Sequence, residues 1–145
     1  MLEIRPTDDF ENIKRLGVHA GLEPSSRTDG ERLGLWGAFD GRRMNGGIAL
    51  ERLDGLAVVT WLWVAEEHRR SGIGSRLIET LLDEARRLEL GTVWATARAP
   101  AFFLRHGFVA VIAGTERDLL LSPCTGCPQR DSSCRPEAVR RDLHW

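Results

Sequence analysis

The order of apolar and polar positions predicts that the chain opens with a strand and a helix. Apolar and polar residues alternate in residues 2–5, as in a half-buried strand. A helix is indicated next by apolar residues at helical spacing after an aspartate that can cap it. These residues are Phe10, Ile13 and Leu16, preceded by Asp8 or Asp9, and Gly17 weakens the helix beyond them.

The next part of the chain is predicted to form a loop and then an antiparallel meander. Residues 21–32 lack periodicity and are rich in Pro, Ser, Gly and Asp, which favours a loop. Three strand-like runs follow, at residues 33–39, 44–53 and 56–64. They are separated by Asp40-Gly41 and Asp54-Gly55, which are typical of hairpin turns.

Residues 72–90 change to a helical period. The apolar stripe consists of Ile73, Leu77, Ile78, Leu81, Leu82, Ala85 and Leu88, and charged residues occupy the opposite face. Beyond Gly91, the pattern predicts a strand at 92–97, a short helix at 99–106, a strand at 108–112 and a last strand at 138–143. The pattern is poor between Gly114 and that last strand. Strand, helix and strand in succession imply a parallel crossover inside a mixed sheet.

The composition is that of an ordinary globular chain. With 145 residues, 42% hydrophobic and 28% charged, we expect one domain over residues 1–145. A net charge of −1 argues against nucleic acid or anionic membranes as partners, since both attract positive charge. No apolar run reaches the roughly 18 residues of a membrane span, and residues 1–11 do not resemble a signal peptide. We therefore expect a cytoplasmic protein.

The segment with the clearest chemical signal joins the strand ending at Val64 to the long helix. It contains Arg69-x-x-Gly72-x-Gly74, so main-chain N–H groups at a helix N-terminus lie beside arginine charge. Such a turn can hold phosphate, although a tight turn with solvated arginines would give the same pattern. Neither the dinucleotide fingerprint nor the P-loop spacing occurs here.

In this context the chain resembles the GNAT superfamily of acyl-CoA N-acyltransferases. Val64, Arg69, Gly72 and Gly74 match that family's V-x-P-x-x-R-x-x-G-x-G pattern, with Glu66 where proline is usual. Residues 102–108, Phe-Phe-Leu-Arg-His-Gly-Phe, match its F-Y-x-x-x-G-F motif. The resemblance implies a single α/β GNAT-type domain with a mixed, mostly antiparallel sheet, helices on both faces and a splayed central strand pair.

The resemblance also implies an acetyl-CoA site and its residues. The loop would bind the coenzyme A pyrophosphate through main-chain N–H groups, and the Ser75 hydroxyl could contribute. Main-chain groups near Trp63 and Val64 would hold the pantetheine between the splayed strands, and the Val64 N–H could polarise the thioester carbonyl. The loop residues concerned are Arg69, Arg70, Ser71, Gly72, Ile73 and Gly74.

The groups that move protons depart from the family pattern. Many relatives carry a glutamate six residues before the motif valine, where this chain has Val58. Glu66, Glu67 and His68 near the strand end are candidate bases, with a solvated loop cluster as the alternative, and the sequence assigns the role to none of the three. The chain has no tyrosine, and Phe103 occupies the position of the usual general acid. His106 is a candidate acid, with a surface cap or direct protonation of the thiolate by solvent as alternatives.

Residues 96–108 are most similar to the N-acetylglutamate synthase branch and the related arsenic-resistance N-acetyltransferases. That likeness implies acetyl transfer to the primary amine of a small, amino-acid-like molecule. Arg98 and Arg105 would bind its acid group if they are not merely solvated, and Trp61 would contact the acceptor or pack on the sheet. A protein or peptide amine, or a non-catalytic acyl-CoA sensor, are the alternatives. Family habit also suggests a homodimer.

A cysteine- and proline-rich loop at residues 122–136 stands apart from this pattern. Cys124, Cys127 and Cys134 could supply three zinc ligands, with His144 or His106 as a fourth. A redox-active thiol pair and simple packing are the other interpretations. If zinc binds, a metal-responsive interaction protein becomes a third functional alternative.

Overall fold

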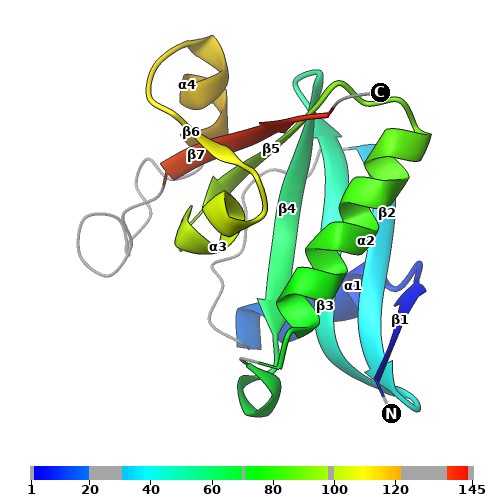
Figure 1. Cartoon of the computed structure of the whole chain (residues 1–145). Helices are drawn as coiled ribbons and strands as arrows, with labels where there is room; N and C mark the ends of the chain where they lie inside the picture. The colour runs from blue at the N-terminus through cyan, green and yellow to red at the C-terminus, as the bar shows by residue number, and fades with distance from the viewer. Residues whose placement is uncertain (1, 20–30, 70, 98–99, 122–136, 144–145) are drawn as a thin grey trace.

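The computed structural model describes residues 2–19, 31–69, 71–97, 100–121 and 137–143, which form one seven-stranded mixed sheet with helices on both faces (Figure 1). The strands are β1 (Leu2–Pro6), β2 (Glu31–Asp40), β3 (Arg43–Leu53), β4 (Leu56–Val64), β5 (Thr92–Ala97), β6 (Val109–Val111) and β7 (Glu137–Asp142). Their order across the sheet is β1-β2-β3-β4-β5-β7-β6. The helices are α1 (Phe10–His19), the 3-10 turn η1 (Glu66–His68), α2 (Ile73–Arg87), α3 (Pro100–Arg105) and α4 (Thr115–Leu121).

The predicted opening and meander are confirmed. The N–H of Asn12 donates to Asp9 Oδ1 at 3.1 Å, so Asp9 caps α1 as its position suggested. Asp54 and Gly55 adopt φ values of 51° and 81°, the left-handed conformation that a two-residue hairpin turn requires. Within the meander, the largest boundary difference is at β2, which begins at Glu31 because residues 31 and 32 pair with the end of β3.

The parallel crossover runs from β4 through α2 to β5. These two strands are parallel, whereas the other pairings in the sheet are antiparallel. β6 does not pair with β5, because β7, the last strand among the described residues, lies between them and is antiparallel to both. Strands distant in sequence thus become neighbours at this edge of the sheet.

The helix α4 was not predicted. It spans only Thr115–Leu121, too short for a helical period to stand out and too short to be stable alone. Two tertiary contacts support it: Leu120 is buried in a cluster with Val58 and Trp94, and the Thr96 hydroxyl donates to the Leu120 carbonyl at 2.8 Å. Packing onto β5 therefore stabilises a helix that the local sequence does not announce.

The two faces of the sheet have separate cores. On one face, α2 contributes Leu77, Ile78 and Leu81, which are fully buried. On the other face, α1 packs Ile13 against Trp61 and Trp63 of β4. Figure 1 shows α2 in front of the strands and α1 behind them.

Gly17 has a packing role that corrects its interpretation as a weak point of the helix. α1 continues through it to His19, and Gly17 is buried. A Cβ atom at this position would lie 2.8 Å from Trp61 Cε3 and 3.1 Å from Trp63 Cδ1. The missing side chain therefore lets α1 approach the two indole rings closely.

We predict that Gly17→Ala destabilises the protein. Alanine would favour the helix by about 1 kcal/mol, but contacts of 2.8 and 2.9 Å with a rigid indole place the overlap in the upper part of the usual range, at about 2–3 kcal/mol, and displace α1. Thermal unfolding should show a melting temperature lower by about 3–8 °C. Gly91→Ala is the control, because a Cβ there meets no atom within 4 Å and should leave the melting temperature unchanged. An equal or higher melting temperature for Gly17→Ala would contradict this account.

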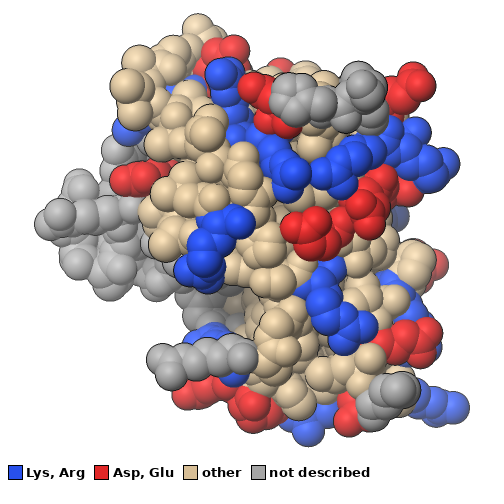
Figure 2. Space-filling model, viewed as in Figure 1, with Lys and Arg blue, Asp and Glu red and all other residues tan. Residues whose placement is uncertain are grey.

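The exposed side of α2 carries both signs of charge. Arg86 pairs with Asp83 at 3.1 Å, and Arg87 with Glu84 at 2.6 Å, each one helical turn apart. The pKa of Glu84 is lowered, chiefly by the hydrogen bond from Arg87, while partial burial opposes the shift. Figure 2 shows acidic and basic side chains interspersed over this face. None of the helices described is long and apolar enough to cross a membrane.

Candidate active site

The candidate site begins where β4 and β5 diverge. Within these two fully described strands, the parallel ladder contains the pairs Val58–Trp94 and Val59–Ala95 and no others. Thr60 then forms a bulge in β4, which bends a strand and changes its direction. Figure 1 shows the strands close together near one end and apart toward the end at which β4 leads into η1. This β4–β5 divergence matches the splayed strand pair expected from the sequence.

The main-chain amide of Val64 faces this divergence. The N–H of Ala65 donates to the Asn45 carbonyl of β3 at 2.8 Å. Successive amides of an extended strand point in opposite directions, so the Val64 N–H points away from β3, toward the β5 side. The Val64 carbonyl accepts a hydrogen bond from Arg69 Nε at 3.2 Å, which holds that guanidinium at the same place. A donor and a positive charge thus meet at the end of β4.

The turn from η1 into α2 presents several amides. Gly72 has φ +85° and caps the helix, and the Arg76 N–H donates to its carbonyl at 3.1 Å. Before it, the Ser71 N–H and hydroxyl both donate to the His68 carbonyl. Helix geometry leaves the first-turn amides without intrahelical acceptors. These are the N–H groups of Ile73, Gly74 and Ser75.

This turn fits an anionic ligand. A Cβ on Gly72 would meet no atom of the described residues within 4 Å, so none of them fills the space above its backbone. First-turn amides and the positive end of the helix dipole both favour a phosphate there. Gly74 has a different explanation: a Cβ there would lie 3.2 Å from Phe102 Cε1, so this glycine allows α3 to approach α2.

The two candidate glutamates lie on the exposed turn η1. Glu67 Oε1 accepts a hydrogen bond from Arg43 Nη2 at 2.7 Å, which directs it toward β3, on the far side of β4 from the divergence. Glu66 is exposed, and its carbonyl accepts from the Arg69 N–H. Catalysis by either carboxylate stays a prediction.

The aromatic residues of the second motif have distinct environments. Phe103, at the usual position of a general acid, is 8% exposed and belongs to the core. Its ring makes edge-on contacts with Phe102 and Phe108, with centroids 5.4 Å and 5.1 Å apart. A hydrocarbon ring in this position packs and cannot donate a proton.

His106 lies between α2 and the end of α3. Its Nε2 is 3.0 Å from Ser75 Oγ, and its Nδ1 is 3.0 Å from Glu79 Oε1. The imidazole is 4.9 Å from the Phe102 ring, and its side chain is 13% exposed. The structure therefore places His106 beside the first turn of α2. Sequence reasoning missed Glu79, although its spacing of four from Ser75 puts both on one helix face.

The predicted acceptor and metal residues have mixed outcomes. Trp61 is 7% exposed and packs on α1, an environment that fits the packing interpretation, and contact with an acceptor stays a prediction. Arg105 is exposed at the end of α3. Among the residues described, no cluster of His, Cys, Asp or Glu could hold a metal ion. Six predicted positions lie outside the described residues: Arg70, Arg98, Cys124, Cys127, Cys134 and His144.

Three buried polar atoms on β3 and β4 lack hydrogen-bond partners in the described part of the chain. They are Asn45 Oδ1, Thr60 Oγ1 and Trp63 Nε1. Asn45 is 1% exposed, and its own carbonyl binds the amide that follows Val64. Unsatisfied buried polar atoms are rare and are often associated with function. Asn45 and Thr60 gave no signal in the sequence.

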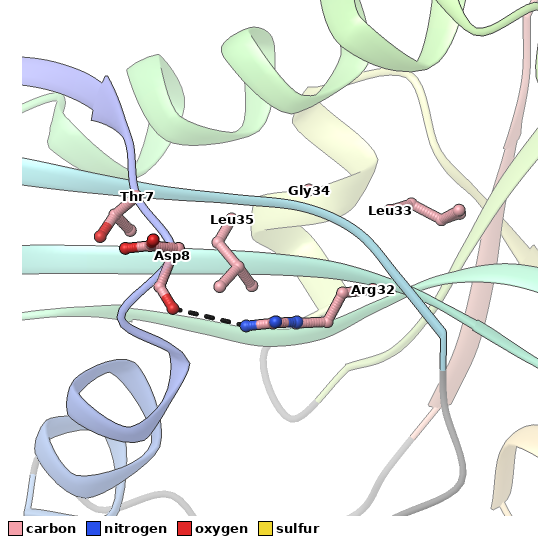
Figure 3. A pocket seen from close by; sticks show the side chains of 6 residues that line it. All are labelled: Thr7, Asp8, Arg32, Leu33, Gly34 and Leu35. Atoms are coloured by element: carbon pink, nitrogen blue, oxygen red, sulfur yellow. Dashed lines mark hydrogen bonds between the residues drawn. The ribbon is translucent and has the colours of Figure 1, made fainter.

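A shallow hollow elsewhere on the sheet is not part of this site. Figure 3 shows Arg32 beside it, with Nη1 donating to the Asp8 carbonyl at 3.4 Å. Arg32 is the second residue of β2 and lies level with Glu51 of β3 and Val58 near the beginning of β4, whereas the candidate site is at the end of β4. The hollow is lined by Thr7, Asp8, Arg32, Leu33, Gly34 and Leu35.

Comparisons with solved structures show the same fold in several acetyltransferases. The chain superposes with a TM-score of 0.70 and 17% identity on N-acetylglutamate synthase from Neisseria gonorrhoeae complexed with coenzyme A and N-acetyl-glutamate, covering 100% of this chain and 36% of that one. For the ribosomal-protein-S18-alanine N-acetyltransferase from Escherichia coli the TM-score is 0.71 and the identity 17%, covering 100% and 96%. A GNAT family acetyltransferase from Elizabethkingia anophelis with acetyl-CoA bound gives 0.67 and 14%, covering 98% of each chain.

A family model settles the family. Residues 31–110, more than half of the chain, match the acetyltransferase (GNAT) domain. This match includes the β4–β5 divergence, the turn into α2 and the aromatic motif of α3, the same features that the geometry brings together. The chain is therefore a member of the GNAT family of acetyltransferases.

Proposed function

We propose that this protein transfers the acetyl group of acetyl-CoA directly to the primary amine of a small, amino-acid-like molecule. The observation that carries the proposal is the β4–β5 divergence, with the Val64 N–H facing it and the turn into α2 beside it. In direct transfer, the amine nitrogen forms a bond to the thioester carbonyl carbon and the carbon–sulfur bond breaks. The proton lost by the amine passes to a base or to solvent, and the thiolate of coenzyme A takes up a proton.

The proposed work of the protein is binding and electrostatic stabilisation. The amides of Ile73, Gly74 and Ser75 and the charge of Arg69 would bind the pyrophosphate, with Arg70 and Ser71 in the same loop. Main-chain groups of Trp63 and Val64 would hold the pantetheine along β4. The Val64 N–H would then donate to the carbonyl oxygen as negative charge develops on it.

The choice of a small amine rests on residues 96–108 and their similarity to the N-acetylglutamate synthase branch. One structural neighbour contains N-acetyl-glutamate, which supports an acidic small molecule as acceptor. Another neighbour is named for acetylating the alanine of a ribosomal protein, so a protein or peptide amine is the competing acceptor. The absence of tyrosine and the glutamate position taken by Val58 keep a non-catalytic acyl-CoA sensor as the third candidate.

The test is acetyl-CoA turnover with a panel of amino acids, amino phosphonates, polyamines and short peptides, read by mass spectrometry. An acetylated small acid is the expected product. Acetylation of peptides alone would replace the small-molecule proposal with a protein acceptor. Coenzyme A binding without release of thiol above background would favour the sensor or a macromolecular acceptor outside the panel.

Arg105 offers a test of acceptor recognition. If its guanidinium binds the carboxylate of the acceptor, Arg105→Ala should raise the KM for an acidic acceptor by about 5- to 30-fold, the cost of a lost charge-assisted hydrogen bond. The KM for an uncharged amine should stay unchanged. An equal effect on both acceptors, or none, would remove Arg105 from the acceptor site. Arg117→Ala, at a partly exposed arginine in α4, is the control.

A further inference from the structure

Ser75, His106 and Glu79 form a continuous hydrogen-bond chain across the contact between α2 and α3. Both distances, Ser75 Oγ to His106 Nε2 and His106 Nδ1 to Glu79 Oε1, are 3.0 Å. In the neutral imidazole that carries its proton on Nδ1, Nδ1 donates to the Glu79 carboxylate and Nε2 accepts from the Ser75 hydroxyl. In this arrangement Glu79 determines that the nitrogen facing Ser75 is the acceptor.

These two hydrogen bonds hold the first turn of α2 against α3. Ser75 supplies one of the three first-turn amides, and its side chain is tied to an imidazole that is itself held in place. The imidazole lies against the Phe102 ring, which in turn occupies the space left by the missing side chain of Gly74. From β7, Arg141 Nη1 donates to the main-chain carbonyl of His106 at 2.7 Å.

We infer that His106 and Glu79 are positioning residues for the phosphate-binding turn and that they act through Ser75. The inference rests on the proposed function, because it assigns a role to residues around the same coenzyme A loop. The hydrogen bond to His106 fixes the side chain of Ser75. The main-chain N–H of Ser75 is thereby held in the direction of the phosphate. Loss of these hydrogen bonds lets the turn relax. Coenzyme A binding is then weaker, and the acetyl-transfer step is unchanged.

Two histidine substitutions separate the two bonds. In His106→Gln, the side-chain amide of the new residue can reach the position of Nε2 and accept from Ser75. In His106→Asn, the shorter side-chain amide can reach only the position of Nδ1, where it contacts Glu79. Measured by calorimetry, His106→Asn and Ser75→Ala should each raise the Kd for coenzyme A by about 3- to 10-fold, the value of one hydrogen bond. His106→Gln should stay within about twofold of the unaltered protein. In kinetics the same variants should change the KM for acetyl-CoA and not kcat.

The role of Glu79 has its own pair of variants. Glu79→Ala removes the acceptor for Nδ1 and should raise the Kd for coenzyme A, while Glu79→Gln retains an acceptor oxygen and should restore most of the affinity. Glu84→Ala is the matched control, because this carboxylate is on the same helix but pairs with Arg87 instead. It should leave the affinity for coenzyme A unchanged.

A double-mutant cycle tests whether His106 acts through Ser75. In the Ser75→Ala background, His106→Asn should have no further effect on coenzyme A binding. Additive effects would overturn the inference. A fall in kcat of tenfold or more with an unchanged Kd would also overturn it and would make His106 a general acid instead.

The substrate S-acetylpantetheine distinguishes this inference from the proposed function. It lacks the phosphates, so all of these variants should use it as well as the unaltered protein does, while their use of acetyl-CoA is impaired. If the unaltered protein binds no coenzyme A, the proposed function and the inference both fail. If it binds coenzyme A and the variants bind it equally well, the inference alone is wrong.

Discussion

Gly72→Ala should weaken coenzyme A binding by about tenfold or more while the protein stays folded. Gly72 has φ +85°, a backbone conformation that costs a residue with a Cβ roughly 1–2 kcal/mol. The added methyl group would also project into the space that a phosphate is proposed to fill, which no atom of the described residues occupies within 4 Å. Calorimetry with coenzyme A measures the loss, and circular dichroism checks the fold.

Gly55→Ala provides the matched control for backbone strain. Gly55 has φ +81° and also has open space around a Cβ, but it lies in the β3–β4 turn at the other end of β4. Both variants should lose similar stability, and only Gly72→Ala should lose affinity. Unchanged affinity in folded Gly72→Ala, or an equal loss in both variants, would refute the assignment of the phosphate-binding turn.

Removing the N–H of Val64 should reduce kcat by about 100-fold or more, the typical effect of deleting one oxyanion donor. The cleanest change replaces Val64 by its α-hydroxy acid, which exchanges the amide N–H for an ester oxygen and keeps the side chain. The β3–β4 ladder should survive, because the neighbouring Ala65 amide is the one that donates to β3. Affinity for coenzyme A should change far less than kcat, since the effect lies in the transition state.

The same replacement at Leu62 tests whether the effect belongs to one position. Leu62 precedes Val64 by two residues, so its amide points to the same side of β4. Its loss should change kcat only a few-fold. If both replacements reduce kcat equally, the effect is a general weakening of β4, and if neither does, Val64 does not stabilise the reacting carbonyl.

Local pattern in the sequence predicted most of the elements that position the site. Two Asp-Gly turns and the alternation around them determine the meander, because a hairpin turn needs residues that tolerate positive φ. The 3.6-residue stripe determines α2, since its apolar face must be buried. The turn ending at Gly72 was also predictable, because its glycine and the helix start after it are both local features.

Contacts between distant segments decided the rest. The place of β7 between β5 and β6 and the short helix α4 depend on packing partners that no local window contains. Gly17 is required by Trp61 and Gly74 by Phe102, although both glycines resemble ordinary flexible positions in the sequence.

The hydrogen-bond chain around the proposed phosphate-binding turn shows the same division. The sequence by itself determined the family motifs, the strand that ends at Val64 and the helix that carries Ser75 and Glu79 on one face. It placed His106 one residue before Gly107, with no indication of what that side chain meets. Only the tertiary structure brings His106 onto α2, because the partners are 31 and 27 residues away in sequence. Residue spacing encodes contacts within a helix or a hairpin, whereas contacts between elements depend on how their buried faces pack.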